Sequence, residues 1–154
     1  PGAPLFLIRI ADRRCILSLQ GELFMVVGYK WLLVMAGGSL GAASRYGIGL
    51  LAARFWGTSF PYGTLTANMA GCFIIGLIFA LADRSRLLTP DVRLLLITGY
   101  LGALTTFSSF SLETVNAGRA GLALQSLTNI LINNLGGLTL TYLGLRLGSL
   151  RWGV

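Results

Sequence analysis

Histidine is absent from this sequence of 154 residues, and charged residues and cysteines are few. Without an imidazole the chain has no histidine metal site, no histidine acid–base catalysis and no histidine pH switch. The two cysteines are Cys15 and Cys72. Nothing in their positions suggests a disulfide framework or a thiolate metal site, and Cys72 lies in an apolar run typical of a small core residue.

Charged residues make up only 11% of the chain, whereas 55% of its residues are hydrophobic. Soluble domains carry about a quarter charged residues, so the composition indicates a membrane protein. The 21 glycines are typical of closely packed transmembrane helices. The net charge of +7 comes with basic residues that flank apolar runs and have no nucleic-acid motif around them. We therefore expect contact with the lipid bilayer and no nucleic-acid partner.

Four apolar segments are long enough to cross a membrane, and they predict an all-α integral membrane protein with four transmembrane helices. These segments are 29–55, 62–82, 94–115 and 121–145. Charges interrupt the short apolar runs of residues 1–28, so we predict an N-terminal extension there and assign it no function. Residues 29–150 then form a single transmembrane domain.

Polar side chains are concentrated in the third segment, between residues 99 and 113. Five hydroxyl groups occur there, on Thr105, Thr106, Ser108, Ser109 and Ser111. An unpaired polar group is costly at membrane depth, and Gly102 followed by two β-branched threonines lowers helix propensity. The pattern predicts a third helix broken near its middle, with free backbone carbonyls beside a polar cavity. The alternative is a buried helix whose hydroxyls bond to the preceding turn.

Other unusual residues lie near this stretch or in the neighbouring segments. Phe107 and Phe110 are three residues apart, so both rings project from one face of the resumed helix. The Asn68 amide has to find a partner in lipid, either another helix or a ligand. Arg45 either snorkels to the membrane surface or draws anions into a vestibule. A polar stripe with a spacing of four follows the fourth segment: Gln125, Asn129 and Asn133.

Three motifs of this chain occur in the order and in the segments expected of one known family. They are residues 37–46 (GGSLGAASRY), 63–71 (GTLTANMAG) and 102–113 (GALTTFSSFSLE). The sequence resembles the Fluc (CrcB) family of fluoride channels over about residues 25–150. The resemblance implies a passive, fluoride-selective channel, and not an enzyme, that exports fluoride across the microbial cytoplasmic (inner) membrane. It also implies a multi-pass, antiparallel homodimer of dual topology, with a structural sodium ion at its centre.

The resemblance assigns roles to residues by their motif positions. It implies that Phe107 and Phe110 are fluoride-facing rings, and that the carbonyls of Gly102 and Thr105 bind the sodium ion. The remaining implied site residues are Asn68 as the pore amide, Ser109 and Thr106 in the polar part of the pore, Asn133 on the pore-facing stripe, and Arg45 at the vestibule. Family members tend to carry a Tyr and then a Ser where Asn129 and Asn133 align, so this chain departs from the family there.

A small proton-coupled multidrug exporter is the alternative function, since such a transporter can also be a four-span, dual-topology dimer. It needs a titratable carboxylate deep in the bilayer. The first two predicted spans contain no Asp or Glu, and Glu113 lies near the end of the third. A purely structural subunit is a weaker possibility. Basic residues favour the side that holds both termini, so a heterodimer with an oppositely oriented partner stays open beside the homodimer.

Overall fold

The computed structural model describes residues 5–82 and 88–151, and in these ranges the regular structure is helical, without a strand. Helix α1 runs from Leu5 to Trp56, and helix α2 from Tyr62 to Ala82. The helix that contains the first predicted span therefore begins well before residue 29. The sequence has no proline between Pro4 and Pro61 that would end a helix earlier.

The rest of the chain forms two further helical rods. The third rod consists of α3 (Pro90–Arg93), the π-helix η1 (Leu94–Leu101), α4 (Gly102–Leu104) and, after two extended residues, α5 (Phe107–Arg119). The fourth consists of α6 (Ala123–Leu131), the π-helix η2 (Ile132–Gly136) and α7 (Gly137–Arg151). Residues 83–87 and the side chains of the N-terminal extension up to residue 26 lie outside the described residues.

Local sequence explains where several of these helices begin. Pro90 is the first residue of α3, where its missing N–H costs little, and Thr89 Oγ1 caps this helix by accepting the Val92 N–H at 3.4 Å. Gly57 and Gly121 have positive φ angles, +76° and +77°, in the turns that precede α2 and α6. Glycine adopts this backbone conformation without a Cβ clash.

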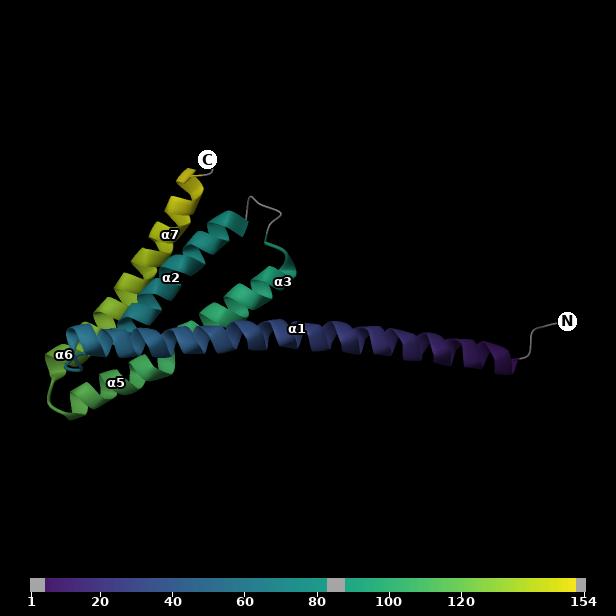
Figure 1. The fold of residues 1–154 in the computed structure, drawn as a ribbon, viewed down its shortest axis with the longest axis horizontal. Coiled ribbons are helices and arrows are strands. Elements are labelled where there is room, and N and C mark those ends of the chain that lie inside the picture. Colours follow the sequence, from purple (N-terminus) through teal and green to yellow (C-terminus); the bar gives the residue numbers. More distant parts are fainter. Residues whose placement is uncertain (1–4, 83–87, 152–154) are drawn as a thin grey trace.

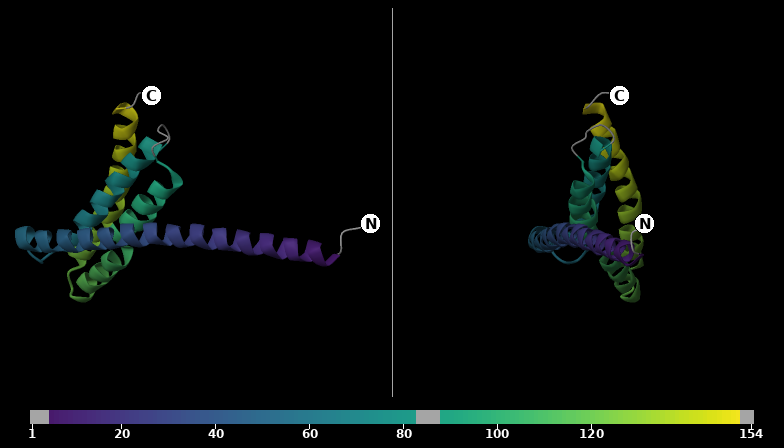
Figure 2. Two further views of the ribbon diagram at one scale, coloured as in Figure 1. Left: turned by 45° about the vertical axis from the view of Figure 1, so that its right-hand side comes forward. Right: turned by 90° about the vertical axis from the view of Figure 1, so that its right-hand side faces the viewer.

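Close backbone contacts at glycines hold the rods together. Helices α2 and α7 lie side by side in each view (Figures 1 and 2). A methyl group on Gly76 of α2 would collide with the carbonyl of Thr141 in α7. The crossing of α1 and η1 is equally tight, because a methyl group on Gly41 would collide with the carbonyl of Tyr100. Contacts through small residues are typical of transmembrane bundles.

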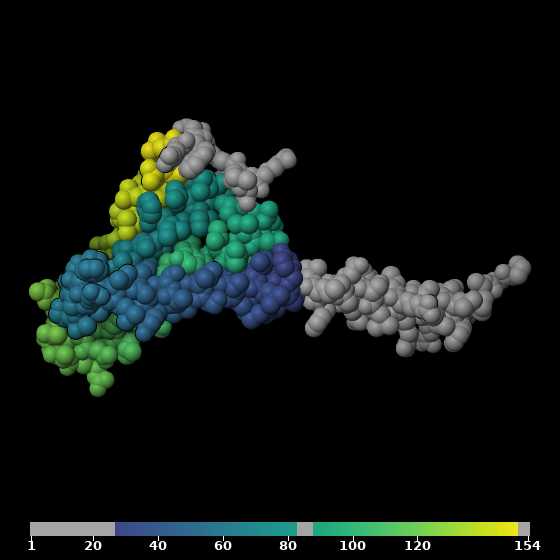
Figure 3. Space-filling view, viewed as in Figure 1, coloured from purple at the N-terminus to yellow at the C-terminus, as the bar shows by residue number. Residues whose placement is uncertain are grey.

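In the view of Figure 1, helix α1 crosses in front of the other helices. Helices α2, α3 and α7 lie on one side of it, and α5 and α6 lie on the other (Figure 1). The third rod contacts α1 at Tyr100 and Ala103, just before the extended residues 105–106, and the space-filling view shows α1 covering part of this rod (Figure 3). This arrangement puts the polar stretch in the middle of the bundle.

The surface of the described residues is rich in apolar side chains. Few of their hydrophobic side chains are buried, and Ala67, Leu101 and Leu104 form one packed cluster of these. Leucine and aromatic side chains of α1, α5 and α7 are exposed, among them Trp31, Leu112 and Leu138. So large an apolar surface suits contact with lipid or with a second chain.

Two helical stretches in the described part are long and apolar enough to cross a membrane by length and composition: Tyr62–Ala82 and Pro90–Arg119. They coincide with the second and third predicted spans. The first and fourth predicted spans carry polar residues, such as Arg45 and Asn129, that lower their hydropathy. Those two spans stay predictions.

Candidate functional site

Two extended residues interrupt the third rod in the middle of its polar stretch. Thr105 has φ −82° and ψ 152°, and Thr106 has φ −150° and ψ 113°. Gly102 has helical angles, φ −61° and ψ −32°. The extended conformation thus falls on the two β-branched residues, which favour it, and not on the glycine.

Side-chain hydrogen bonds replace helical bonds across this interruption. The Thr106 N–H donates to Asn68 Oδ1 at 2.8 Å, whereas in a continuous helix it would donate to the Gly102 carbonyl. The Ser109 N–H donates to Thr106 Oγ1, the N-cap of α5, at 3.2 Å. In a continuous helix it would donate to the Thr105 carbonyl. The carbonyls of Gly102 and Thr105 therefore lose their usual helical donors.

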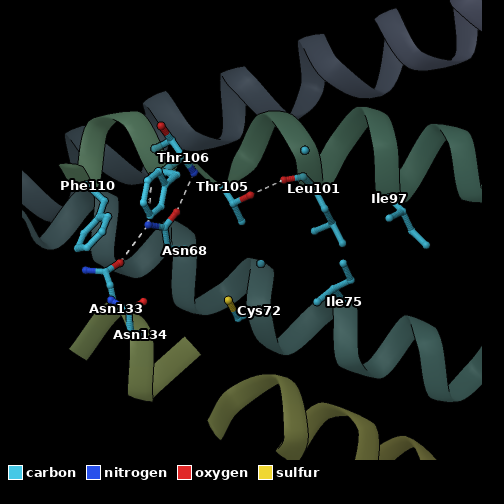
Figure 4. A pocket seen from close by; sticks show the side chains of 13 residues that line it. Asn68, Cys72, Ile75, Ile97, Leu101, Thr105, Thr106, Phe110, Asn133 and Asn134 are labelled. Carbon is cyan, nitrogen blue, oxygen red and sulfur yellow. Dashed lines mark hydrogen bonds between the residues drawn. The ribbon is translucent and has the colours of Figure 1, made fainter. Parts of the chain in front are cut away.

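A cavity of about 360 Å³ lies beside the interruption (Figure 4). Its walls come from α2, the third rod and η2, which are far apart in the sequence. The residues expected at the site that line it are Asn68, Gly102, Thr105, Thr106, Phe107, Phe110 and Asn133. The fold thus gathers every expected site residue except Ser109 and Arg45 around one cavity.

The cavity is crossed by an amide pair. Asn68 Nδ2 donates to Asn133 Oδ1 at 3.0 Å and to the Thr106 carbonyl at 3.3 Å. Figure 4 shows Asn68 between Thr106 on one side and Asn133 on the other. Asn68 therefore makes an interhelical hydrogen bond, one of its two alternatives, and it also lines the cavity. Its binding of a ligand stays a prediction.

The two phenylalanine rings lie next to each other at the start of α5. Their centroids are 5.5 Å apart and their planes are inclined by 53°. Phe110 is 7% exposed, whereas Phe107 is 77% exposed. Within one chain, therefore, Phe110 is held by its neighbours and Phe107 faces outward.

The five hydroxyl groups of the polar stretch divide into two kinds. Thr105 and Ser111 donate to the carbonyl four residues earlier, at 3.0 and 2.8 Å, as the buried-helix alternative predicts. Thr106 Oγ1 instead donates to Ser109 Oγ at 3.1 Å and lies 3.2 Å from Ser108 Oγ. The second group forms a hydroxyl cluster at the N-terminus of α5.

Arg45 is half-buried on α1. It does not occur among the described residues that line the cavity. The structure does not bring its side chain to this site, and its role at a vestibule rests on its position in the sequence.

Glu113 lies at a second cavity of about 450 Å³, which Tyr62, Asn116 and Gln125 also line. Its Oε1 accepts a hydrogen bond from the Thr64 hydroxyl at 2.6 Å. Its Oε2 is buried, and no described group donates to it. The hydrogen-bond partner of this carboxylate in the structure is thus a hydroxyl group.

Asn129 and Thr114 were not expected at the site. Both side chains are buried, and Asn129 Nδ2 donates to Thr114 Oγ1 at 2.8 Å. The spacing of four residues between Asn129 and Asn133 predicts that both lie on one helix face. It does not predict which side chain each of them contacts.

Comparison with known proteins identifies the family of the chain. The family described as "CrcB-like protein, Camphor Resistance (CrcB)" matches residues 32–145. The chain belongs to this family. The prediction made from the three sequence motifs is thereby confirmed, and the chain is a membrane protein of a transporter family.

Relatives in this family are similar along most of their length. A protein of Dehalococcoides mccartyi is 45% identical over 119 residues, which cover 77% of this chain and 92% of the relative. Proteins of Shewanella amazonensis and Aeromonas salmonicida are 46% and 44% identical, over 75% and 79% of this chain and 93% and 97% of their own lengths. All three are named fluoride-specific ion channel FluC.

Proposed function

We propose that this chain is a passive, fluoride-selective channel that crosses the microbial cytoplasmic (inner) membrane several times and exports fluoride. The observation that carries the proposal is the cavity at the helix interruption, where amide and hydroxyl groups meet two aromatic rings. The names of relatives at 44–46% identity support the choice of ion.

The chemistry of the cavity suits a small anion. Fluoride is strongly hydrated, so a selective pore has to replace its water with donors that hold the ion loosely. The donors that we assign to it are Asn68, Asn133, Thr106 and Ser109. The positive edges of Phe107 and Phe110 add weak contacts and do not trap the ion as a cation would. Arg45 attracts anions at the pore entrance.

A second, antiparallel copy of the chain completes the pore in this proposal. Phe107 lines the cavity and yet is 77% exposed in the single chain. The amide and hydroxyl groups of this cavity would be costly to leave open to lipid, so another protein surface has to cover them. Two identical chains related by a two-fold axis offer the same helix interruption to each other. A homologous chain of opposite orientation would complete a heterodimer in the same way.

The carbonyls of Gly102 and Thr105 suit a structural sodium ion at the centre of this dimer. Backbone carbonyls released from an unwound helix are common sodium ligands in membrane proteins. A Cβ on Gly102 would have only the Ile97 carbonyl within 4 Å, at 3.7 Å, so the surface beside it is open to a second chain. When bound, the ion would supply a fixed positive charge near both pores.

A proton-coupled multidrug exporter fits these observations less well. It requires a titratable carboxylate on the substrate path. Glu113 does not line the cavity at the interruption, and it is hydrogen-bonded to Thr64 at the second cavity.

Fluoride efflux from liposomes tests the proposed function. Purified protein is reconstituted into vesicles loaded with potassium fluoride, and a potassium ionophore is added so that charge does not build up. A fluoride electrode should record rapid efflux that needs no pH gradient, and a chloride electrode should record none from vesicles loaded with potassium chloride. Efflux only under a pH gradient, or none from protein that runs as an intact oligomer, would refute the channel.

A further inference from the structure

Three asparagine side chains form a continuous hydrogen-bonded relay between α2, η2 and α6. Asn68 Nδ2 donates to Asn133 Oδ1 at 3.0 Å. Asn133 Nδ2 donates to Asn129 Oδ1 at 2.9 Å and to the Asn129 carbonyl at 3.1 Å. Asn129 Nδ2 donates to Thr114 Oγ1 at 2.8 Å, and the Thr114 hydroxyl donates to the Phe110 carbonyl at 2.7 Å. Each amide thus accepts on its oxygen and donates from its nitrogen.

Backbone groups fix the direction of this relay at both ends. The Thr106 N–H can only donate, so the Asn68 atom that faces it is the oxygen. The Phe110 carbonyl can only accept, so the Thr114 proton points to it and the Thr114 oxygen is left to accept from Asn129. Turning any one amide over would set two donors or two acceptors against each other. The relay therefore has a single satisfied arrangement.

Both ends of the relay lie in the same turn of the chain. Thr106 is the N-cap of α5, and Phe110 lies four residues later in its first turn. From Thr106 the hydrogen bonds run to Asn68 in α2, then to Asn133 in η2 and to Asn129 in α6. From Asn129 they run through the Thr114 hydroxyl back to the Phe110 carbonyl. It thereby holds the turn that carries both aromatic rings against two other rods.

Asn129 differs from the other two amides in its surroundings. Asn68 and Asn133 line the cavity, whereas Asn129 is 2% exposed and does not occur among the described lining residues. An ion in the cavity can therefore contact Asn68 and Asn133 but not Asn129. Any effect of Asn129 on such an ion has to pass through its hydrogen bonds.

We propose that Asn129 is a positioning residue that keeps the amides of Asn133 and Asn68 in the one orientation suited to anion conduction. The inference rests on the proposed function. With Asn129 in place, the Asn133 oxygen accepts a hydrogen bond from the Asn68 N–H. An anion that enters the cavity can accept from the same N–H in place of that oxygen. With Asn129 replaced, Asn133 Nδ2 keeps only its longer hydrogen bond, to the backbone carbonyl of residue 129 at 3.1 Å, and its amide is held less firmly against Asn68.

Fluoride efflux from vesicles that carry, on average, less than one channel each tests this inference. Under this condition the number of folded channels and the conduction of each channel are measured separately. The fraction of vesicles that empty reports how many channels folded, and the rate of emptying reports conduction by each channel. We expect Asn129→Leu and Thr114→Val to empty the wild-type fraction of vesicles about tenfold more slowly, the effect of one lost hydrogen bond. Because both changes break one relay, the double variant should be no slower than Asn129→Leu.

Ser126→Ala is the matched control, since Ser126 lies on α6 and its hydroxyl donates to the Thr114 carbonyl, outside the relay. It should conduct at the wild-type rate. If the Asn129→Leu protein does not insert into vesicles, the test rests on Thr114→Val alone, because valine is nearly isosteric with threonine. A wild-type rate in Thr114→Val overturns the inference, as does a loss confined to the emptied fraction. A wild-type protein that gives no fluoride efflux refutes the proposed function itself, so the failure of the inference and the failure of the proposed function are distinguishable.

Discussion

Asn68 and Thr106, 38 residues apart in the chain, are joined by two hydrogen bonds. The Thr106 N–H donates to Asn68 Oδ1 at 2.8 Å, and Asn68 Nδ2 donates to the Thr106 carbonyl at 3.3 Å. One side-chain amide thus satisfies both backbone groups of an extended residue, as a neighbouring strand would. At membrane depth, where water is not available to do this, the pair makes a broken helix tolerable.

Replacing Asn68 with leucine should therefore disrupt both stability and conduction. Asn68→Leu keeps the branching of the side chain at Cγ but leaves both backbone groups of Thr106 unpaired, at about 1–3 kcal/mol for each buried group. We expect a lower melting temperature of the purified protein and fluoride efflux at the background rate. The control for stability is Asn134→Leu, because Asn134 is exposed and bonds only to the Ile130 carbonyl of its own helix, at 2.7 Å. Equal melting temperatures for wild type and Asn68→Leu would contradict the role of this pair.

The two rings should matter through their aromatic edges and not through their bulk. Phe107→Ile and Phe110→Ile should each slow fluoride efflux while the protein still purifies as an oligomer, because an aliphatic side chain lacks the positive ring edge. Only Phe110→Ile should also lower the melting temperature, since Phe110 is buried in the chain and Phe107 is exposed. Wild-type flux in both single variants would exclude an aromatic contribution.

Substitutions at two glycines should separate folding from assembly. Gly102→Leu meets little within the chain, so it should leave the helix content measured by circular dichroism unchanged, yet block close approach of the second chain and stop efflux. Gly41→Leu should fail to fold, because its Cβ would collide with the Tyr100 carbonyl. Thr105→Ser should conduct normally, because the backbone carbonyl is retained. A Gly102→Leu protein that cross-links as a dimer and conducts normally would count against the proposed interface.

Labelling of intact cells should reveal whether both orientations are inserted. Cys15 and Cys72 are first replaced, and Ser85→Cys is introduced between the second and third predicted spans. A membrane-impermeant thiol reagent should then label roughly half of the molecules if the two orientations are equally populated. Lysed cells, in which all molecules should react, provide the control. Protection of essentially every molecule in intact cells would rule out dual topology for this chain.

The sequence by itself determined the family, the positions of the apolar segments and most of the residues around the cavity. These features depend on composition and on short spacings, such as the three residues between Phe107 and Phe110, which a helix converts directly into a shared face. The three motifs are local strings, so they could be read without knowing how the helices pack.

Only the tertiary structure decided which polar groups are partners. The Thr106 N–H bonds to Asn68 and Asn68 bonds to Asn133, across separations of 38 and 65 residues, and no local pattern encodes such pairings. Packing likewise divided two asparagines that share a helix face, since Asn133 lines the cavity and Asn129 is enclosed behind it. The same packing supplied Asn68 as the partner of the extended Thr106, because a buried backbone group needs a hydrogen-bond partner within reach.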